Sequence, residues 1–144
     1  MILIRIVVGL IFLTEGILKF MHPSELGVGL FTALGLPFPH LLAPAVGTVE
    51  IAGGIAILLN FYAGDAALLL LLVVTAALVT TKLPVLLGHT VGPFPLAKLP
   101  RYGWFSFLHE SRTELCMLFG SLAVIFDSGL LIGRRRHWYQ SREF

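Results

Sequence analysis

Apolar residues in this chain gather into four runs, and most of the polar residues fall between them. The runs cover about residues 1–20, 45–61, 66–83 and 105–132. A helix that crosses a membrane needs about 20 predominantly apolar residues, and runs of this length suit that requirement. None of the runs has the polar outer face that a surface helix of a soluble protein carries. The pattern therefore predicts an all-α protein, a transmembrane four-helix bundle formed as a single domain.

The segments between the runs contain residues that stop or turn a helix. In the first long connector, residues 21–44, Ser24 is suited to cap a short helix that ends at Leu34. A tight polar turn at residues 60–65 reverses the chain between the second and third runs. The second long connector, residues 84–104, is punctuated by prolines, which do not continue a helix. These positions predict two long connectors, one tight turn and a C-terminal tail outside the membrane.

Composition argues against the alternative of a soluble helical bundle. Hydrophobic residues make up 57% of the chain and charged residues 12%, whereas a soluble domain carries about 25% charged residues. Too few polar side chains remain to cover a globule. The single cysteine, Cys116, excludes a disulfide, an iron–sulfur cluster or a cysteine zinc site within the chain. We also predict no metal site from the three connector histidines, His22, His40 and His89.

Basic residues indicate how the helices are oriented. Positive charge stays on the cytoplasmic side of a membrane, and the tail at residues 133–144 contains four arginines. We therefore predict a cytoplasmic tail and, after four crossings, a cytoplasmic N-terminus in the inner (plasma) membrane, with both long connectors outside. The tail arginines should also touch anionic lipid. Three basic residues of the outer side oppose this orientation: Lys98, Arg101 and Arg112.

Charged residues within the apolar runs are the most informative feature. Each costs on the order of 2.5–3.5 kcal/mol at the membrane centre unless it pairs or faces a cavity. With the orientation above, each of the four runs brings charged residues to the outer half of the membrane. We predict that five of them form one layer inside the bundle and carry its chemistry: Glu15, Lys19, Glu50, Lys82 and Glu114.

Two interpretations of this layer remain open. In the first, the charges are ion pairs that hold the helices together, Glu15 with Lys19 and Glu50 with Lys82. In the second, they line a polar pocket that opens to the outer face. Together with Glu110, the carboxylates outnumber the two lysines, and a surplus carboxylate at low dielectric holds a proton or binds a cationic or hydrogen-bonding group.

Outside this layer, the residues near the inner ends of the first and fourth runs receive a simpler interpretation. Arg5 and Asp127 lie there, and we expect them to form a structural pair or to extend to the membrane surface.

What the chain lacks narrows the choice of cofactor. A haem held by two histidines needs both at matching depth within the helices, and none lies mid-membrane. Flavin and nicotinamide cofactors need a folded soluble domain, which the chain does not contain. A quinone is the remaining electron carrier, and its candidate contacts are Phe12, Lys19, Lys82 and His109. We expect no nucleic-acid partner.

The order and spacing of several motifs resemble those of the DoxX family of small four-helix membrane proteins. The resemblance covers nearly the whole chain, except residues 84–102 and 134–144. It begins with Arg5-x-x-x-Gly9-x-x-Phe12-x-x-Glu15-Gly16-x-x-Lys19. It continues through Gly35-Leu36-Pro37, Val46-Gly47-x-x-Glu50-x-x-Gly53-Gly54, Lys82, Glu114 and Asp127-Ser128-Gly129.

This resemblance implies a membrane subunit linked to oxidoreductase systems, since the name-giving relatives belong to thiosulfate:quinone oxidoreductase. The leading hypothesis is such a subunit, with a quinone-facing or proton-handling pocket near the outer face and no complete catalytic site of its own. One alternative is a non-catalytic accessory subunit or assembly factor that packs against a larger membrane complex. Another is a small proton-coupled transporter. The expected partners are membrane lipid and other membrane subunits or a redox protein.

Overall fold

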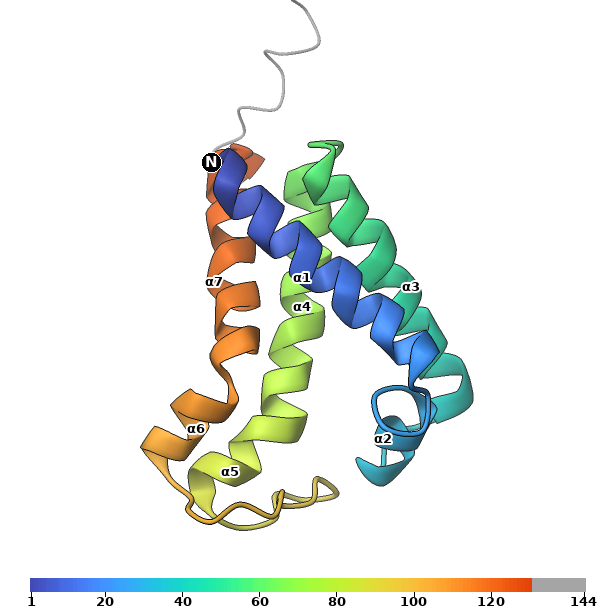
Figure 1. Ribbon diagram of the computed structural model, residues 1–144, viewed down its shortest axis with the longest axis vertical. Helices are drawn as coiled ribbons and strands as arrows, with labels where there is room; N and C mark the ends of the chain where they lie inside the picture. The colour runs from blue at the N-terminus through green and yellow to red at the C-terminus, as the bar shows by residue number, and fades with distance from the viewer. Residues whose placement is uncertain (131–144) are drawn as a thin grey trace, which may run out of the picture.

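The computed structural model describes residues 1–130, and its regular structure is helical (Figure 1). In this part of the chain the only β-type pairing is an isolated bridge between Val91 and Phe94, so the all-α prediction is confirmed. The long helices are α1 (Ile2–Met21), α3 (Pro39–Leu58), α4 (Ala63–Ala77) and α7 (Arg112–Asp127). The short ones are α2 (Val28–Ala33), the π-helical segment η1 (Leu78–Lys82), α5 (Leu83–Leu87) and α6 (Trp104–Glu110). The predicted cytoplasmic tail lies outside the described residues.

The four long helices pack pairwise around one hydrophobic core. Helix α1 lies against α3, α4 lies against α7, α3 also meets α4, and α1 meets α7 toward the end where α1 begins (Figure 1). All four contribute fully buried side chains to the core, among them Phe12, Ile57, Leu70, Val74 and Val124. The core therefore fixes the relative positions of the helices that carry the charged residues.

Helices α1 and α3 approach most closely where each carries two glycines. A Cβ added at Gly54 would lie 2.8 Å from the carbonyl oxygen of Gly9, and one added at Gly16 would lie 2.7 Å from that of Gly47. Small residues at such crossings let two backbones touch. Because Gly9 faces Gly54 and Gly16 faces Gly47, the two helices run antiparallel with a fixed register.

The third predicted helix continues beyond its expected end at residue 83. It passes through η1 and α5 and ends at Leu87, although Pro84 lies within it. A proline ring clashes with the carbonyl four residues earlier and donates no backbone hydrogen bond. The wider π turn accommodates this defect, and the hydroxyls of Thr80 and Thr81 donate to carbonyl oxygens one turn earlier. As a result, Lys82 lies within a continuous helix instead of at its end.

The second helix begins earlier than predicted. It starts at Pro39 instead of residue 45, because a proline in the first helical turn needs no hydrogen bond and already has a helical φ. The short helix before it spans Val28–Ala33, and Gly27 precedes it without a capping side chain. The prediction that Ser24 caps this helix was therefore wrong.

The fourth predicted helix is divided in two. Helix α6 ends at Glu110 and α7 begins at Arg112, with Ser111 between them in a non-helical conformation. Ser111 is fully buried, and its hydroxyl donates to the carbonyl oxygen of Phe107. The break places the first turn of α7, with Glu114, beside the third helix.

Two helices in the described part of the chain are long and apolar enough to cross a membrane. They are Pro39–Leu58, with a mean hydropathy of 1.9, and Ala63–Leu87, with a mean hydropathy of 2.2. Helix α1 carries three charged residues and α7 has 16 residues. Large apolar side chains also face outward on the long helices, for example Leu3, Leu72 and Phe119. An extensive apolar exterior is typical of a surface that contacts lipid or another protein.

The start of α1 and the end of α7 lie at the same end of the molecule (Figure 1). The two long connectors lie at the opposite end, and they approach each other there. A Cβ added at Gly35, in the first connector, would lie 3.3 Å from Cβ of Pro93 in the second. The connectors therefore close this end of the helical assembly together.

Candidate functional site

The most buried ion pair in the described residues joins α1 to α3. Nζ of Lys19 lies 2.7 Å from Oε2 of Glu50, and their side chains are 13% and 4% exposed. Side chains on a helix lean toward its N-terminus. In these antiparallel helices Lys19 therefore leans back over Gly16, while Glu50 leans over Gly47. Since those two glycines are in contact, the ammonium and carboxylate groups meet between the backbones.

The carboxylate of Glu50 is not fully satisfied by this contact. Its Oε2 atom is buried, and within residues 1–130 no hydrogen-bond donor other than the Lys19 ammonium group reaches it. Buried carboxylates normally accept several hydrogen bonds. Glu15, which is half-buried one turn before Lys19, also interacts electrostatically with Glu50. The site therefore contains two carboxylates and one ammonium group.

A second ion pair joins the third helix to α7. Nζ of Lys82, the last residue of η1, lies 3.3 Å from Oε1 of Glu114 in the first turn of α7. The two side chains are 19% and 21% exposed, so this pair is more accessible than the pair of Lys19 and Glu50.

We expect Lys82→Met to destabilise the protein less than Lys19→Met does. Glu114 is more exposed than Glu50, so that water or a lipid headgroup can solvate it once its partner is lost, and exposure to solvent weakens the contribution of an ion pair. The thermal unfolding midpoints of the two variants in the same detergent provide the measurement. A larger loss for Lys82→Met would contradict this ranking of the two pairs.

The pairings of the first interpretation, Glu15 with Lys19 and Glu50 with Lys82, were wrong. Lys19 reaches across to Glu50 instead of along its own helix, because the glycine contacts bring α1 and α3 together at that level. Lys82 is directed to α7 by contact between the third helix and α7. The five predicted residues thus form two pairs plus Glu15, and no ion pair or hydrogen bond links the two pairs within residues 1–130.

The two other predicted site residues, Phe12 and His109, and the additional carboxylate Glu110 have simpler surroundings. Phe12 is fully buried in the hydrophobic core. His109 is exposed, and its ring lies against the guanidinium group of Arg112, with Nε2 3.1 Å from Nη1. Glu110 is half-buried at the end of α6. Within residues 1–130 no group of three or more histidine, cysteine or carboxylate side chains could hold a metal ion.

Of the two alternatives expected for Arg5 and Asp127, the structure shows the structural pair. Nη2 of Arg5 lies 2.5 Å from Oδ2 of Asp127, which joins the first turn of α1 to the last residue of α7. Ser121 received no role from the sequence, and it is fully buried with a hydroxyl that has no hydrogen-bond partner among the described residues. Its position in line with Glu114 and Met117 is a helical spacing that indicates a core-facing side chain.

Comparisons with known proteins support the membrane assignment. The DoxX family model matches residues 1–83 of this chain, which include Glu15, Lys19, Glu50 and Lys82. The chain is also 39% identical over 124 residues to the uncharacterized membrane protein Rv3486 of Mycobacterium tuberculosis, and the match covers 86% of this chain and 72% of that protein. No solved structure matches. The matched region holds the buried pair and the helices that bring it together. Because the family model covers more than half of the chain and the relative is a membrane protein, this chain belongs to the DoxX family and is a membrane protein.

Proposed function

We propose that the chain is the membrane subunit of an oxidoreductase system, with a proton-handling or quinone-facing site at Lys19 and Glu50. The observation that carries the proposal is the Glu50 carboxylate, which is buried, incompletely hydrogen-bonded and close to a second carboxylate, Glu15. A carboxylate in these surroundings is suited to take up and release a proton. The link to oxidoreductases comes from the family resemblance.

The residues have distinct roles in this proposal. A bound quinone would supply the electron-accepting ring, and the Lys19 ammonium group would donate a hydrogen bond to one of its carbonyl oxygens. Glu50 would exchange a proton with the outer side of the membrane, and Glu15 would balance the charge of Lys19 while Glu50 is protonated. Lys82 and Glu114 provide a second, more accessible pair.

The test is binding of decylubiquinone to the purified chain in detergent, measured as a shift of the thermal unfolding midpoint. The wild type is expected to be stabilised, and Glu50→Gln is expected to fold but to lose most of the shift. Lys82→Met serves as the control, since it removes a charge from the other pair. Equal shifts in the wild type and Glu50→Gln would exclude Glu50 from a quinone site.

A second candidate function is a non-catalytic accessory subunit or assembly factor. It is favoured by the pairing of Lys82 with Glu114 and of Arg5 with Asp127, because each pair joins two helices and leaves no net charge. Purification in mild detergent distinguishes the candidates. A stoichiometric larger complex that retains its activity with Glu50→Gln would support the accessory role and contradict the proton-handling role.

We also propose that α1, α3, the helix from α4 to α5, and α7 all cross the plasma membrane, with both termini in the cytoplasm. The proximity of the start of α1 to the end of α7 supports an even number of crossings. Cysteines are introduced at Ser141 or at Thr90 in a Cys116→Ser background and treated with an impermeant maleimide. The cysteine at position 141 should be labelled only from the inside, and the cysteine at position 90 only from the outside. Labelling of Ser141→Cys from outside would refute this orientation.

A further inference from the structure

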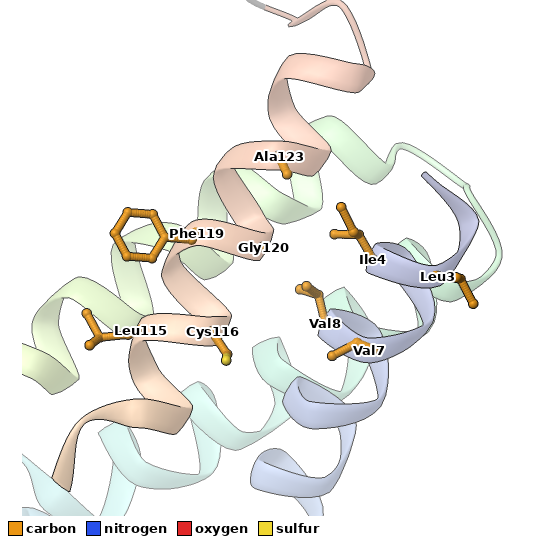
Figure 2. Close-up of a pocket in the computed structure, with 9 residues that line it drawn as sticks. All are labelled: Leu3, Ile4, Val7, Val8, Leu115, Cys116, Phe119, Gly120 and Ala123. Atoms are coloured by element: carbon orange, nitrogen blue, oxygen red, sulfur yellow. The ribbon is translucent and has the colours of Figure 1, made fainter. Parts of the chain in front are cut away.

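An apolar groove of about 490 Å³ lies between α1 and α7. Its walls include Ile4, Val7 and Val8 from α1 and Cys116, Gly120 and Ala123 from α7. Figure 2 shows Ile4 and Val8 facing the side of α7 that carries Cys116 and Ala123. The volume falls within the range of about 300–1,000 Å³ that is typical of small-molecule sites. The lining favours an apolar occupant.

One end of this groove is next to a charged pair. Asp127 lies one helical turn beyond Ala123 on the same face of α7, and Arg5 directly follows Ile4 in α1. A guanidinium group has five N–H donors. Among the described residues, Asp127 is the one partner of the Arg5 guanidinium group, and the Nε–H of Arg5 is buried without an acceptor. The apolar groove therefore ends beside an ion pair, and the guanidinium group of that pair has unused hydrogen-bond donors.

We propose that the groove binds an acyl chain of an anionic phospholipid, whose phosphate accepts hydrogen bonds from Arg5. Arginine and phosphate form charge-assisted hydrogen bonds with matched geometry. The pair lies where α1 begins and α7 ends. The orientation proposed above puts this end on the cytoplasmic side, where the leaflet is rich in anionic lipid. This lipid site is independent of the proposed quinone or proton site, because it uses none of the residues of that site.

The packing of α1 on α7 favours a flexible acyl chain as the occupant of the groove, in place of a helix from a second copy of the protein. Helices associate closely in membranes where small residues let their backbones approach. The one glycine in this groove, Gly120, is already covered by α1, since a Cβ added there would overlap a methyl group of Val8. A second backbone therefore cannot reach Gly120, whereas an acyl chain can fit along the remaining space.

The proposal is tested by lipid binding to the full chain in detergent micelles. Phosphatidylglycerol and phosphatidylcholine with identical acyl chains are titrated in, and retention is measured by native mass spectrometry. Both lipids carry the phosphate, but the choline cation of phosphatidylcholine would lie close to the Arg5 guanidinium group and be repelled by it. We therefore expect phosphatidylglycerol to bind about tenfold more tightly. The double variant Arg5→Gln with Asp127→Asn, which has no stranded charge, should lose this preference but still bind lipid. Equal affinity of the wild type for both lipids would overturn the role of Arg5.

Variants that fill the groove test the site of the acyl chain. Ala123→Phe should reduce lipid retention at least tenfold, whereas the matched variant Ala76→Phe, at an exposed position of α4 outside the lining, should not. Cys116→Leu, at an exposed position in the groove, provides a second filling variant if Ala123→Phe does not fold. Unchanged retention in the folded filling variants would overturn the proposal. So would a wild-type dimer that these variants dissociate, because a second copy would then occupy the groove.

Discussion

Replacing Lys19 with methionine is expected to destabilise the protein by about 3–5 kcal/mol, the usual cost of breaking a buried ion pair on one side. The change leaves the Glu50 carboxylate without a cation at a site where it is 3% exposed. Glu15 is close by and adds repulsion. The variant should accumulate poorly in membranes, and in detergent its thermal unfolding midpoint should fall well below that of the wild type.

The converse change, Glu50→Gln, should cost much less. Glu15 lies four residues before Lys19 on the same helix, a spacing at which opposite charges interact, so it can serve as the substitute counter-ion. The double variant Glu15→Gln with Glu50→Gln lacks that substitute and should lose much more stability than Glu50→Gln alone. The double variant Lys19→Met with Glu50→Gln should instead recover most of the wild-type stability. Equal losses for the two single variants would show that Glu15 does not share Lys19.

Replacing Gly54 with alanine is expected to have the second large effect, about 3 kcal/mol at the upper end of the range for overpacking. The new methyl group would lie 2.8 Å from the carbonyl oxygen of Gly9 and 2.9 Å from the backbone nitrogen of Leu13. Backbone atoms cannot rotate away, so α1 and α3 must separate. This outweighs the gain of about 1 kcal/mol in helix propensity.

The neighbouring glycine provides a matched control. At Gly53 the added methyl group would lie 2.8 Å from Cδ1 and 2.9 Å from Cγ of Leu70, a fully buried side chain. One core side chain must then shift, but the three nearest atoms include no backbone atom. Gly53→Ala should therefore lower the unfolding midpoint less than Gly54→Ala. If the two variants are equally stable, the backbone contact between α1 and α3 is not as close as the structure indicates.

Much of the fold could be predicted because apolar runs and helix-stopping residues are local features of the sequence. The interruption at Ser111 and the continuation through Pro84 could not, since both depend on contacts with other helices. Pro84 alone predicts a helix end, and only the wider turn before it explains the continuous helix.

The residues of the two ion pairs could be predicted from the sequence, but not how they pair. The cost of charges in a membrane identifies Lys19, Glu50, Lys82 and Glu114 without a structure. Which lysine meets which glutamate depends on helix register, and this is set between α1 and α3 by the glycine contacts. The groove between α1 and α7 has no local signal, because each helix supplies only one wall.

The π-helical segment η1 (Leu78–Lys82) has a consequence for how the chain tolerates changes in length. A π turn contains one residue more than an α turn, and each residue of an α-helix accounts for about 100° of rotation. Deleting one residue here would convert η1 to a regular α-helix and leave the core positions of α4 in phase. The residues after the deletion would also keep nearly their present direction, because the extra residue of the π turn offsets the lost rotation, so Lys82 should still reach Glu114. The same deletion earlier in α4 would instead rotate core residues such as Leu70 toward lipid.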